Sequence, residues 1–176
     1  MSYYPEMAVT GRHRFLATKF FVKFYNLLPK SYVSKGDLDL VYYGNLREYT
    51  AKLVDISAIK DVQTFLTEDI YQLRSVQPDL TVFHKQPYIE NFNQTKTAGR
   101  PDLVVEIWSD GNSETVRAEK FSLYSSSPVT EHWYIDQQDN EVKRFLGETE
   151  LPSVFLGEIA TTNGGVTVDL TDLALD

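Results

Sequence analysis

Near the N-terminus, hydrophobic residues recur with the spacing of one face of an α-helix, while Lys19 and Lys23 lie off that face. The hydrophobic stripe consists of Leu16, Phe20, Phe24, Leu27 and Leu28. The pattern predicts an amphipathic helix that ends before Pro29, because proline cannot continue a helix.

Two short segments in the middle of the chain are typical of strands. Residues 76–83 (VQPDLTVF) are rich in β-formers and carry a proline near their start. Residues 101–109 (PDLVVEIWS) are almost continuously hydrophobic, as expected of a strand that is covered on both faces. The Asn, Gly and Pro content of residues 85–100 predicts a loop between them, and the pattern of 37–75 supports no firm prediction.

The second half of the chain predicts one helix and further strands. Residues 110–113 form a predicted turn whose Asn112 or Ser113 caps a helix over 114–126, which stops before Pro128. Residues 131–136 and 141–146 flank a polar turn and predict a β-hairpin, and 164–175 adds one strand and a short tail. This order predicts a single α/β domain over residues 1–176 with a mixed sheet.

Composition and charge narrow the possible classes of protein. The chain is 42% hydrophobic, so it is expected to fold, and it has no cysteine, which excludes disulfides and thiolate metal sites. It has no hydrophobic run of about 18 residues and no signal-peptide pattern, so we expect a cytoplasmic protein without a membrane span. Residues 1–36 carry a net charge of +5 within a total of −8. This basic end either contacts a phosphate backbone or is simply a solvated helix face.

An acidic residue stands in the middle of the most hydrophobic predicted strand. Side chains alternate along a strand, so Glu106 shares a face with Asp102, Val104 and Trp108. A carboxylate buried there needs a cationic partner. If strand 76–83 is a neighbour, Asp79 at its start and Glu106 can converge on one hard cation such as Mg²⁺.

A lysine stands on the hydrophobic face of the following predicted helix. Lys120 lies at helical spacing from Val116, Leu123 and Tyr124, where a core residue is expected. Glu106 is therefore its predicted partner. A purely structural ion pair and a lysine that reaches solvent along its hydrophobic stem remain alternatives to a catalytic role.

Four motifs in order, QPDLTVF, RPDLVVEIWS, RAEKFSLY and PVTEHWYID, resemble the putative restriction endonuclease family within the PD-(D/E)xK nuclease superfamily. The resemblance implies a restriction-endonuclease-like core with a mixed sheet flanked by helices. It also implies Mg²⁺- or Mn²⁺-dependent hydrolysis of nucleic acid, with DNA as the expected partner and a homodimer as a natural arrangement for cutting two strands.

The resemblance assigns roles to particular residues. Asp79 and Glu106 match the two metal-binding acids, and Lys120 takes the role of the superfamily's lysine, whose usual position holds Trp108. Asp102 belongs to a second Pro-Asp pair and competes with Asp79, but its Cα is expected about 13 Å from that of Glu106.

Two further residues are weaker candidates for the site. Ser109 either orients the water at Glu106 or starts the turn, and His13 lies near the family's helix-opening histidine.

The chain departs from the family pattern at two places. An upstream glutamate in an ELIDG-like stretch has no counterpart, and Glu6, Asp39 and Glu48 are its possible replacements. The acid four residues before the lysine is replaced by Val116. A nuclease fold that has lost catalysis and binds DNA or a protein partner is therefore the alternative to an active endonuclease.

Overall fold

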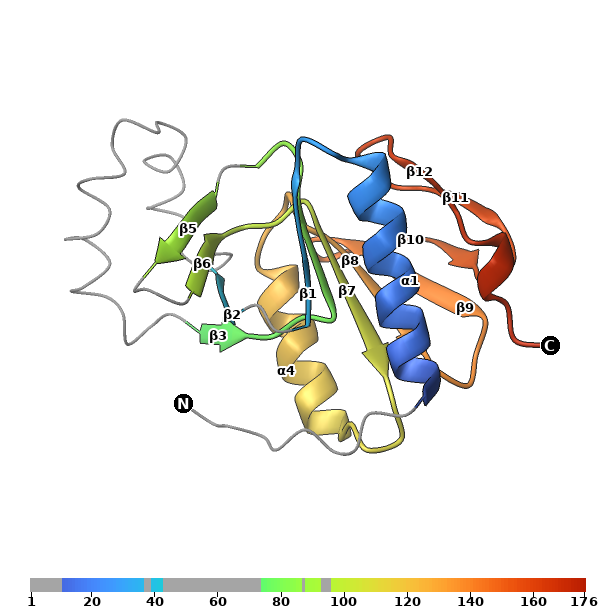
Figure 1. Cartoon of the computed structure of the whole chain (residues 1–176). Coiled ribbons are helices and arrows are strands. Elements are labelled where there is room, and N and C mark those ends of the chain that lie inside the picture. The colour runs from blue at the N-terminus through green and yellow to red at the C-terminus, as the bar shows by residue number, and fades with distance from the viewer. Residues whose placement is uncertain (1–10, 37–38, 43–73, 87, 93–95) are drawn as a thin grey trace.

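The structure is a computed structural model that describes residues 11–36, 39–42, 74–86, 88–92 and 96–176. Its centre is a six-stranded mixed sheet with the strand order β1-β4-β7-β8-β9-β10 (Figure 1). These strands are β1 (Tyr32–Lys35), β4 (Leu80–Phe83), β7 (Leu103–Trp108), β8 (Glu131–Asp136), β9 (Glu141–Leu146) and β10 (Thr149–Phe155). The pair β7–β8 is parallel and the other neighbours are antiparallel, which confirms the predicted α/β fold with a mixed sheet.

Two smaller sheets accompany the central one. The first has the order β3-β2-β6-β5, and the second is the hairpin of β11 and β12. Their bounds are β2 (Asp39–Tyr42), β3 (Arg74–Val76), β5 (Tyr88–Phe92), β6 (Lys96–Gly99), β11 (Ile159–Thr161) and β12 (Thr167–Asp169), and a 3-10 helix follows at Thr171–Leu173. Neither helix in the described residues is long and hydrophobic enough to cross a membrane.

Two helices cover opposite faces of the central sheet. Helix α1 (Gly11–Leu27) buries Leu16, Phe20 and Phe24 in the cluster that also holds the odd-numbered side chains of β7. Helix α4 (Glu114–Ser125) buries its Leu123 and Tyr124 in a second cluster with Val104 and Trp108 of the same strand. Strand β7 is consequently buried along its whole length, as its near-continuous hydrophobic sequence predicts.

Helix α4 begins and ends where the sequence indicates. The hydroxyl of Ser113 accepts a hydrogen bond from the Val116 amide and caps the first turn, and the helix ends at Ser125, ahead of Pro128. Because α4 connects the parallel strands β7 and β8, it must lie back across the sheet. That crossover brings the middle of α4 over the middle of β7.

Several predicted elements need correction. The predicted loop 85–100 is wrong, because β5 and β6 lie in it and pair with each other, and β6 also pairs with β2. Pairing within a sheet outweighs the turn-forming composition of this segment. The predicted strand 76–83 is shorter: β3 ends at Val76 in another sheet and β4 starts at Leu80, with Pro78, which has no N–H to donate, between them.

The C-terminal end and the first helix also differ from prediction. The strand predicted within residues 164–175 is confirmed as β12, but its partner β11 and strand β10 were not predicted. In α1, Leu27 is 45% exposed, while Leu28 just beyond the helix is buried. Leu28, which follows Phe24 by four residues, continues the buried stripe in place of Leu27.

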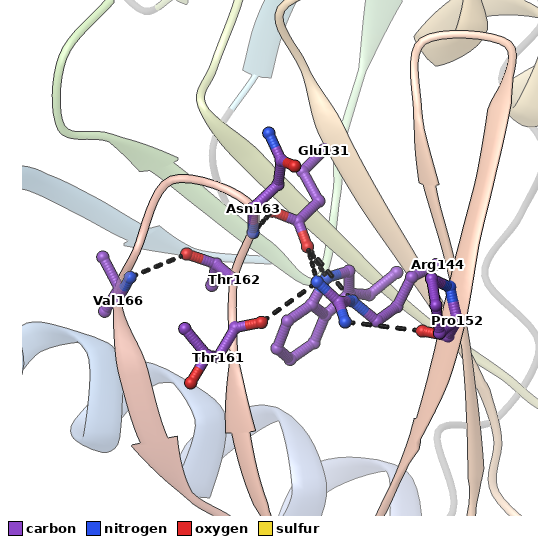
Figure 2. Close-up of polar contacts among 8 residues, drawn as sticks. Glu131, Arg144, Pro152, Thr161, Thr162, Asn163 and Val166 are labelled. Carbon is purple, nitrogen blue, oxygen red and sulfur yellow. Dashed lines mark hydrogen bonds and ion pairs between the residues drawn. The ribbon is translucent and has the colours of Figure 1, made fainter.

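A buried ion pair fastens the C-terminal hairpin to the sheet. Figure 2 shows Arg144 of β9 beside Glu131 of β8, with Arg144 Nη2 2.8 Å from Glu131 Oε1. Both side chains also form hydrogen bonds with the backbone of the C-terminal hairpin and its loop. Arg144 Nη2 donates to the carbonyl of Thr161 at 3.1 Å, and Glu131 Oε2 accepts the backbone N–H of Asn163 at 2.7 Å. The pair therefore links the central sheet to the β11–β12 loop.

Substituting Arg144→Met is expected to lower the free energy of unfolding by about 3–5 kcal/mol, because it leaves the Glu131 carboxylate buried without a cation. Urea unfolding at pH 7 measures the loss. The matched control is Lys143→Met on the same strand, where the lysine is exposed and the expected change is within about 0.5 kcal/mol. Equal losses of unfolding free energy in the two variants would show that the ion pair does not stabilise the fold.

Candidate active site

The two predicted acids lie on neighbouring strands. Strand β4 pairs with β7 so that Leu80 is opposite Val105. Asp79 directly precedes β4, and continuing the antiparallel register places it beside Glu106. The two carboxyl groups are close enough for Asp79 to raise the pKa of Glu106. The predicted adjacency of the two segments is thus confirmed.

Glu106 is held by two side chains of α4. Its side chain is only 2% exposed, and Lys120 Nζ lies 3.1 Å from each carboxylate oxygen. The Tyr124 hydroxyl donates a hydrogen bond of 2.6 Å to Oε1. The predicted partnership of Glu106 with Lys120 is therefore confirmed, and the lysine side chain, 23% exposed, connects the buried carboxylate with the surface.

The electrostatics of Glu106 are dominated by its burial. Loss of solvation on burial and, to a smaller extent, the nearby charge of Asp79 raise the pKa of Glu106 to about 7, against the opposing effects of Lys120 and the Tyr124 hydroxyl. An acid whose pKa is displaced by burial and by a second carboxyl group is typical of functional sites. The pair of acids would favour an added cation.

Trp108, which stands where the sequence resemblance places the superfamily's lysine, contacts Lys120. The ammonium of Lys120 lies 5.6 Å from the centroid of the indole, and the guanidinium of Arg117 lies 5.4 Å from it. The indole also stacks on Tyr134, with centroids 5.7 Å apart. The indole thus limits where the lysine amine can move.

Asp79 is positioned by the backbone of β7 and by the first turn of α1. Its Oδ2 accepts the backbone N–H of Ile107 at 2.7 Å, and its Oδ1 lies 3.0 Å from Nε2 of His13 in the first turn of α1. Gly36 after β1 also lies close, since a Cβ there would be 4.0 Å from Oδ1. His13, a weaker candidate from the sequence, therefore lies in direct contact with the first acid.

The other two candidate residues have structural contacts. Oδ2 of Asp102 accepts the backbone N–H groups of His84, Lys85 and Gln86 at 2.7, 2.9 and 3.0 Å, so this carboxylate holds the turn that follows β4. The hydroxyl of Ser109 donates to the side chain of Asn112 at 3.1 Å and closes the turn before α4. Because Asp102 is engaged in a turn, Asp79 is the better candidate for the first acid of the site. The contact of Ser109 favours its role in starting the turn over a role at Glu106.

Tyr124 was not among the candidate residues predicted from the sequence. The signal was present, because Tyr124 follows Lys120 by one helical turn on the same face, but a tyrosine on a hydrophobic face is normally read as packing. The possible replacements for the upstream glutamate, Glu6 and Glu48, lie outside the described residues, and so does the side chain of Asp39. Within the described ranges no group of three or more His, Cys, Asp and Glu side chains is arranged to hold a metal.

Comparisons with known proteins agree with this fold. The model of the Uma2 family, described as putative restriction endonuclease, matches residues 44–171. A crystal structure of a putative nuclease from Anabaena variabilis superimposes with a TM-score of 0.63 at 14% identity, over 96% of this chain and 82% of that one. No curated protein shows significant sequence similarity to the chain.

The raised pKa of Glu106 makes the stability of the metal-free protein dependent on pH. Between about pH 4.5 and 7 the unfolded chain releases the Glu106 proton while the folded protein retains it, so stability falls as pH rises through this window. Glu106→Gln is expected to flatten this fall and to raise the free energy of unfolding at pH 8 by about 1–3 kcal/mol.

Urea unfolding in EDTA at pH 5 and pH 8 measures both effects. Glu119→Gln, at an exposed acid beside Lys120, is the control and should follow the wild-type pH dependence. A Glu106→Gln protein that is less stable than the wild type at pH 8 would contradict the prediction.

Proposed function

Because the chain belongs to the Uma2 family of putative restriction endonucleases, we propose that it is a divalent-metal-dependent nuclease that hydrolyses phosphodiester bonds of DNA. The observation that carries the proposal is the buried Glu106 carboxylate, held between Lys120 and Tyr124 and flanked by Asp79. Acids on neighbouring strands with a lysine at one of them form the set of groups that this chemistry requires.

The two acids fit a magnesium or manganese ion. Hard cations of this kind take one or two carboxylates and complete their coordination with water and phosphate oxygens. Asp79 and Glu106 would hold the ion, which would supply a water of lowered pKa and stabilise the oxygen that leaves phosphorus. The nearby charge of Asp79 adds to the effect of burial in raising the pKa of Glu106, and an ion between the two carboxyl groups would relieve their repulsion.

The remaining residues are assigned to positioning and charge. Lys120 is in contact with both oxygens of Glu106 and reaches the surface, so its ammonium can orient the attacking water and neutralise charge that develops on phosphate. Tyr124 fixes the rotamer of Glu106, and Ile107 N–H fixes one oxygen of Asp79. His13 supplies a donor at the other oxygen of Asp79. A homodimer would place two such sites on the two strands of a duplex.

A nuclease fold without catalysis is the second candidate. The observation in its favour is that no third acid joins Asp79 and Glu106 within the part of the chain that the structure describes. Such a protein would bind DNA or a protein partner and leave phosphodiester bonds intact. The cleavage assay below separates the two.

The wild-type protein is expected to nick supercoiled DNA in Mg²⁺ or Mn²⁺ and to be inactive in EDTA. Lys120→Met should reduce the rate at least about 100-fold while Mn²⁺ binding is retained, because the amine acts on the reacting groups and not as a metal ligand. Asp79→Asn and Glu106→Gln should abolish both cleavage and Mn²⁺ binding. Gel-based nicking and calorimetric Mn²⁺ titration measure the two properties.

Glu119→Gln is the matched control in the cleavage assay, since Glu119 is exposed on the same helix. The enzyme proposal fails if the wild type leaves single- and double-stranded nucleic acid intact in both metals, or if cleavage survives Glu106→Gln. Absent cleavage with retained DNA binding would support the second candidate.

Metal affinity is expected to depend on pH. A metal must displace the proton from Glu106 below pH 7, so the Mn²⁺ dissociation constant should rise about tenfold per pH unit on descending from pH 7 to pH 5. Calorimetry at pH 5, 6, 7 and 8 tests this. An affinity that is constant between pH 5 and 7 would show that Glu106 does not bind the ion.

A further inference from the structure

Most basic side chains of the first helix are engaged within the protein. Lys23 Nζ lies 2.7 Å from Asp172, Lys19 lies 3.9 Å from the same carboxylate, and Arg12 donates to the carbonyl of Leu173 at 2.6 Å. These contacts fasten α1 to the 3-10 helix near the C-terminus. The positive charge of this end of the chain is therefore partly engaged in contacts within the protein, which the sequence did not predict.

Basic side chains near the central sheet are engaged too. Arg144 is buried against Glu131, and Arg117 lies 3.7 Å from Asp136 and donates to the carbonyl of Ser109. Lys120 is the partner of Glu106. None of these groups is a simple solvent-exposed charge.

Arg14 and Lys35 differ from this set, because both are exposed and neither has an ion pair with a carboxylate within the described ranges. They lie on adjoining elements. Lys35 Nζ donates to the hydroxyl of Thr18 at 2.9 Å, and Arg14 lies one helical turn before Thr18 on the same face of α1. Two cations are thus brought together from segments that are distant in sequence.

Both cations belong to segments that contact Asp79. Arg14 follows His13, whose ring contacts the Asp79 carboxylate at 3.0 Å. Lys35 precedes Gly36, whose backbone N–H donates to the Asp79 carbonyl at 3.2 Å. Each cation is therefore one residue away from a group that contacts the first acid.

The opposite flank of the site carries the opposite charge. Asp110 and Glu114 are exposed in the turn before α4 and in the first turn of that helix. A phosphate chain that passes through the site would be repelled there and attracted on the α1 side. The opposite charges of the two flanks would orient a bound phosphate chain, although the net charge of the whole chain is −8.

We propose that Arg14 and Lys35 form a phosphate-binding rim that holds the nucleic-acid backbone next to the scissile phosphate, on the α1 side of Asp79. The proposal rests on the proposed nuclease function and adds the surface that binds the substrate. The rim binds backbone phosphate and reads no base, so its contribution is independent of sequence and sensitive to salt. Its residues act in binding and not in the chemical step.

The salt dependence of binding tests the rim directly. Each phosphate contact to duplex DNA contributes about −0.9 to the slope of the logarithm of the binding constant against the logarithm of salt concentration. Fluorescence anisotropy with a labelled 20-base-pair duplex, in EDTA to prevent cleavage, gives this slope between 50 and 200 mM KCl. Arg14→Gln and Lys35→Gln should each flatten it by about 0.9 and weaken binding several-fold.

Lys30→Gln is the matched control. Lys30 is exposed just beyond the other end of α1, and its substitution removes the same charge far from Asp79. It should leave both the slope and the affinity at the wild-type values. Thermal unfolding of the three variants verifies that each is folded before binding is measured.

The rim proposal is overturned if Arg14→Gln and Lys35→Gln keep the wild-type slope, if Lys30→Gln flattens it equally, or if the wild type binds neither the duplex nor a 20-nucleotide single strand. Cleavage kinetics separate its failure from that of the nuclease function. If the rim binds substrate, removing either of its cations should raise KM and leave kcat unchanged. Cleavage with wild-type KM in both variants would remove the rim and leave the nuclease intact.

Discussion

The candidate site depends on the cost of burying one carboxylate. Strand β7 has a hydrophobic cluster on each face, and Glu106 lies in its centre with almost no solvent contact. A charge in that place is tolerated only with compensating donors, and α4 supplies both a lysine and a tyrosine. The position of α4 over β7 is therefore tied to the chemistry of Glu106, because the same contacts that stabilise the acid also orient it.

The two halves of the site come from different parts of the fold. Glu106 and its donors belong to the β7-α4-β8 crossover, whereas Asp79 is oriented by α1, by the segment after β1 and by a backbone amide of β7. Helix α1 is in turn fastened to the C-terminal 3-10 helix. Residues from the beginning, middle and end of the chain thus support one cluster of polar groups.

Local pattern was sufficient for the elements that carry the site and insufficient for much of their surroundings. The near-continuous hydrophobic run of β7 and the misplaced lysine of α4 together predicted the Glu106–Lys120 pair, because burial of either charge is costly alone. The strands β5, β6 and β10 escaped prediction, since their formation depends on pairing with distant segments. The contact of Tyr124 with Glu106 and the orientation of Asp79 by Ile107 are likewise tertiary, and no spacing along the chain expresses them.

The two Pro-Asp pairs of this chain show how one dipeptide can serve two purposes. Both aspartates follow a proline just before a strand and accept backbone N–H groups from neighbouring segments, yet Asp79 faces the second acid whereas Asp102 closes a turn with three amides. A search for the dipeptide alone would find it twice in this chain and could not tell which aspartate is the candidate site residue. The two aspartates are distinguished by which of them lies opposite Glu106 in the strand pairing. Alignments of distant relatives are therefore best based on strand register and not on the dipeptide sequence.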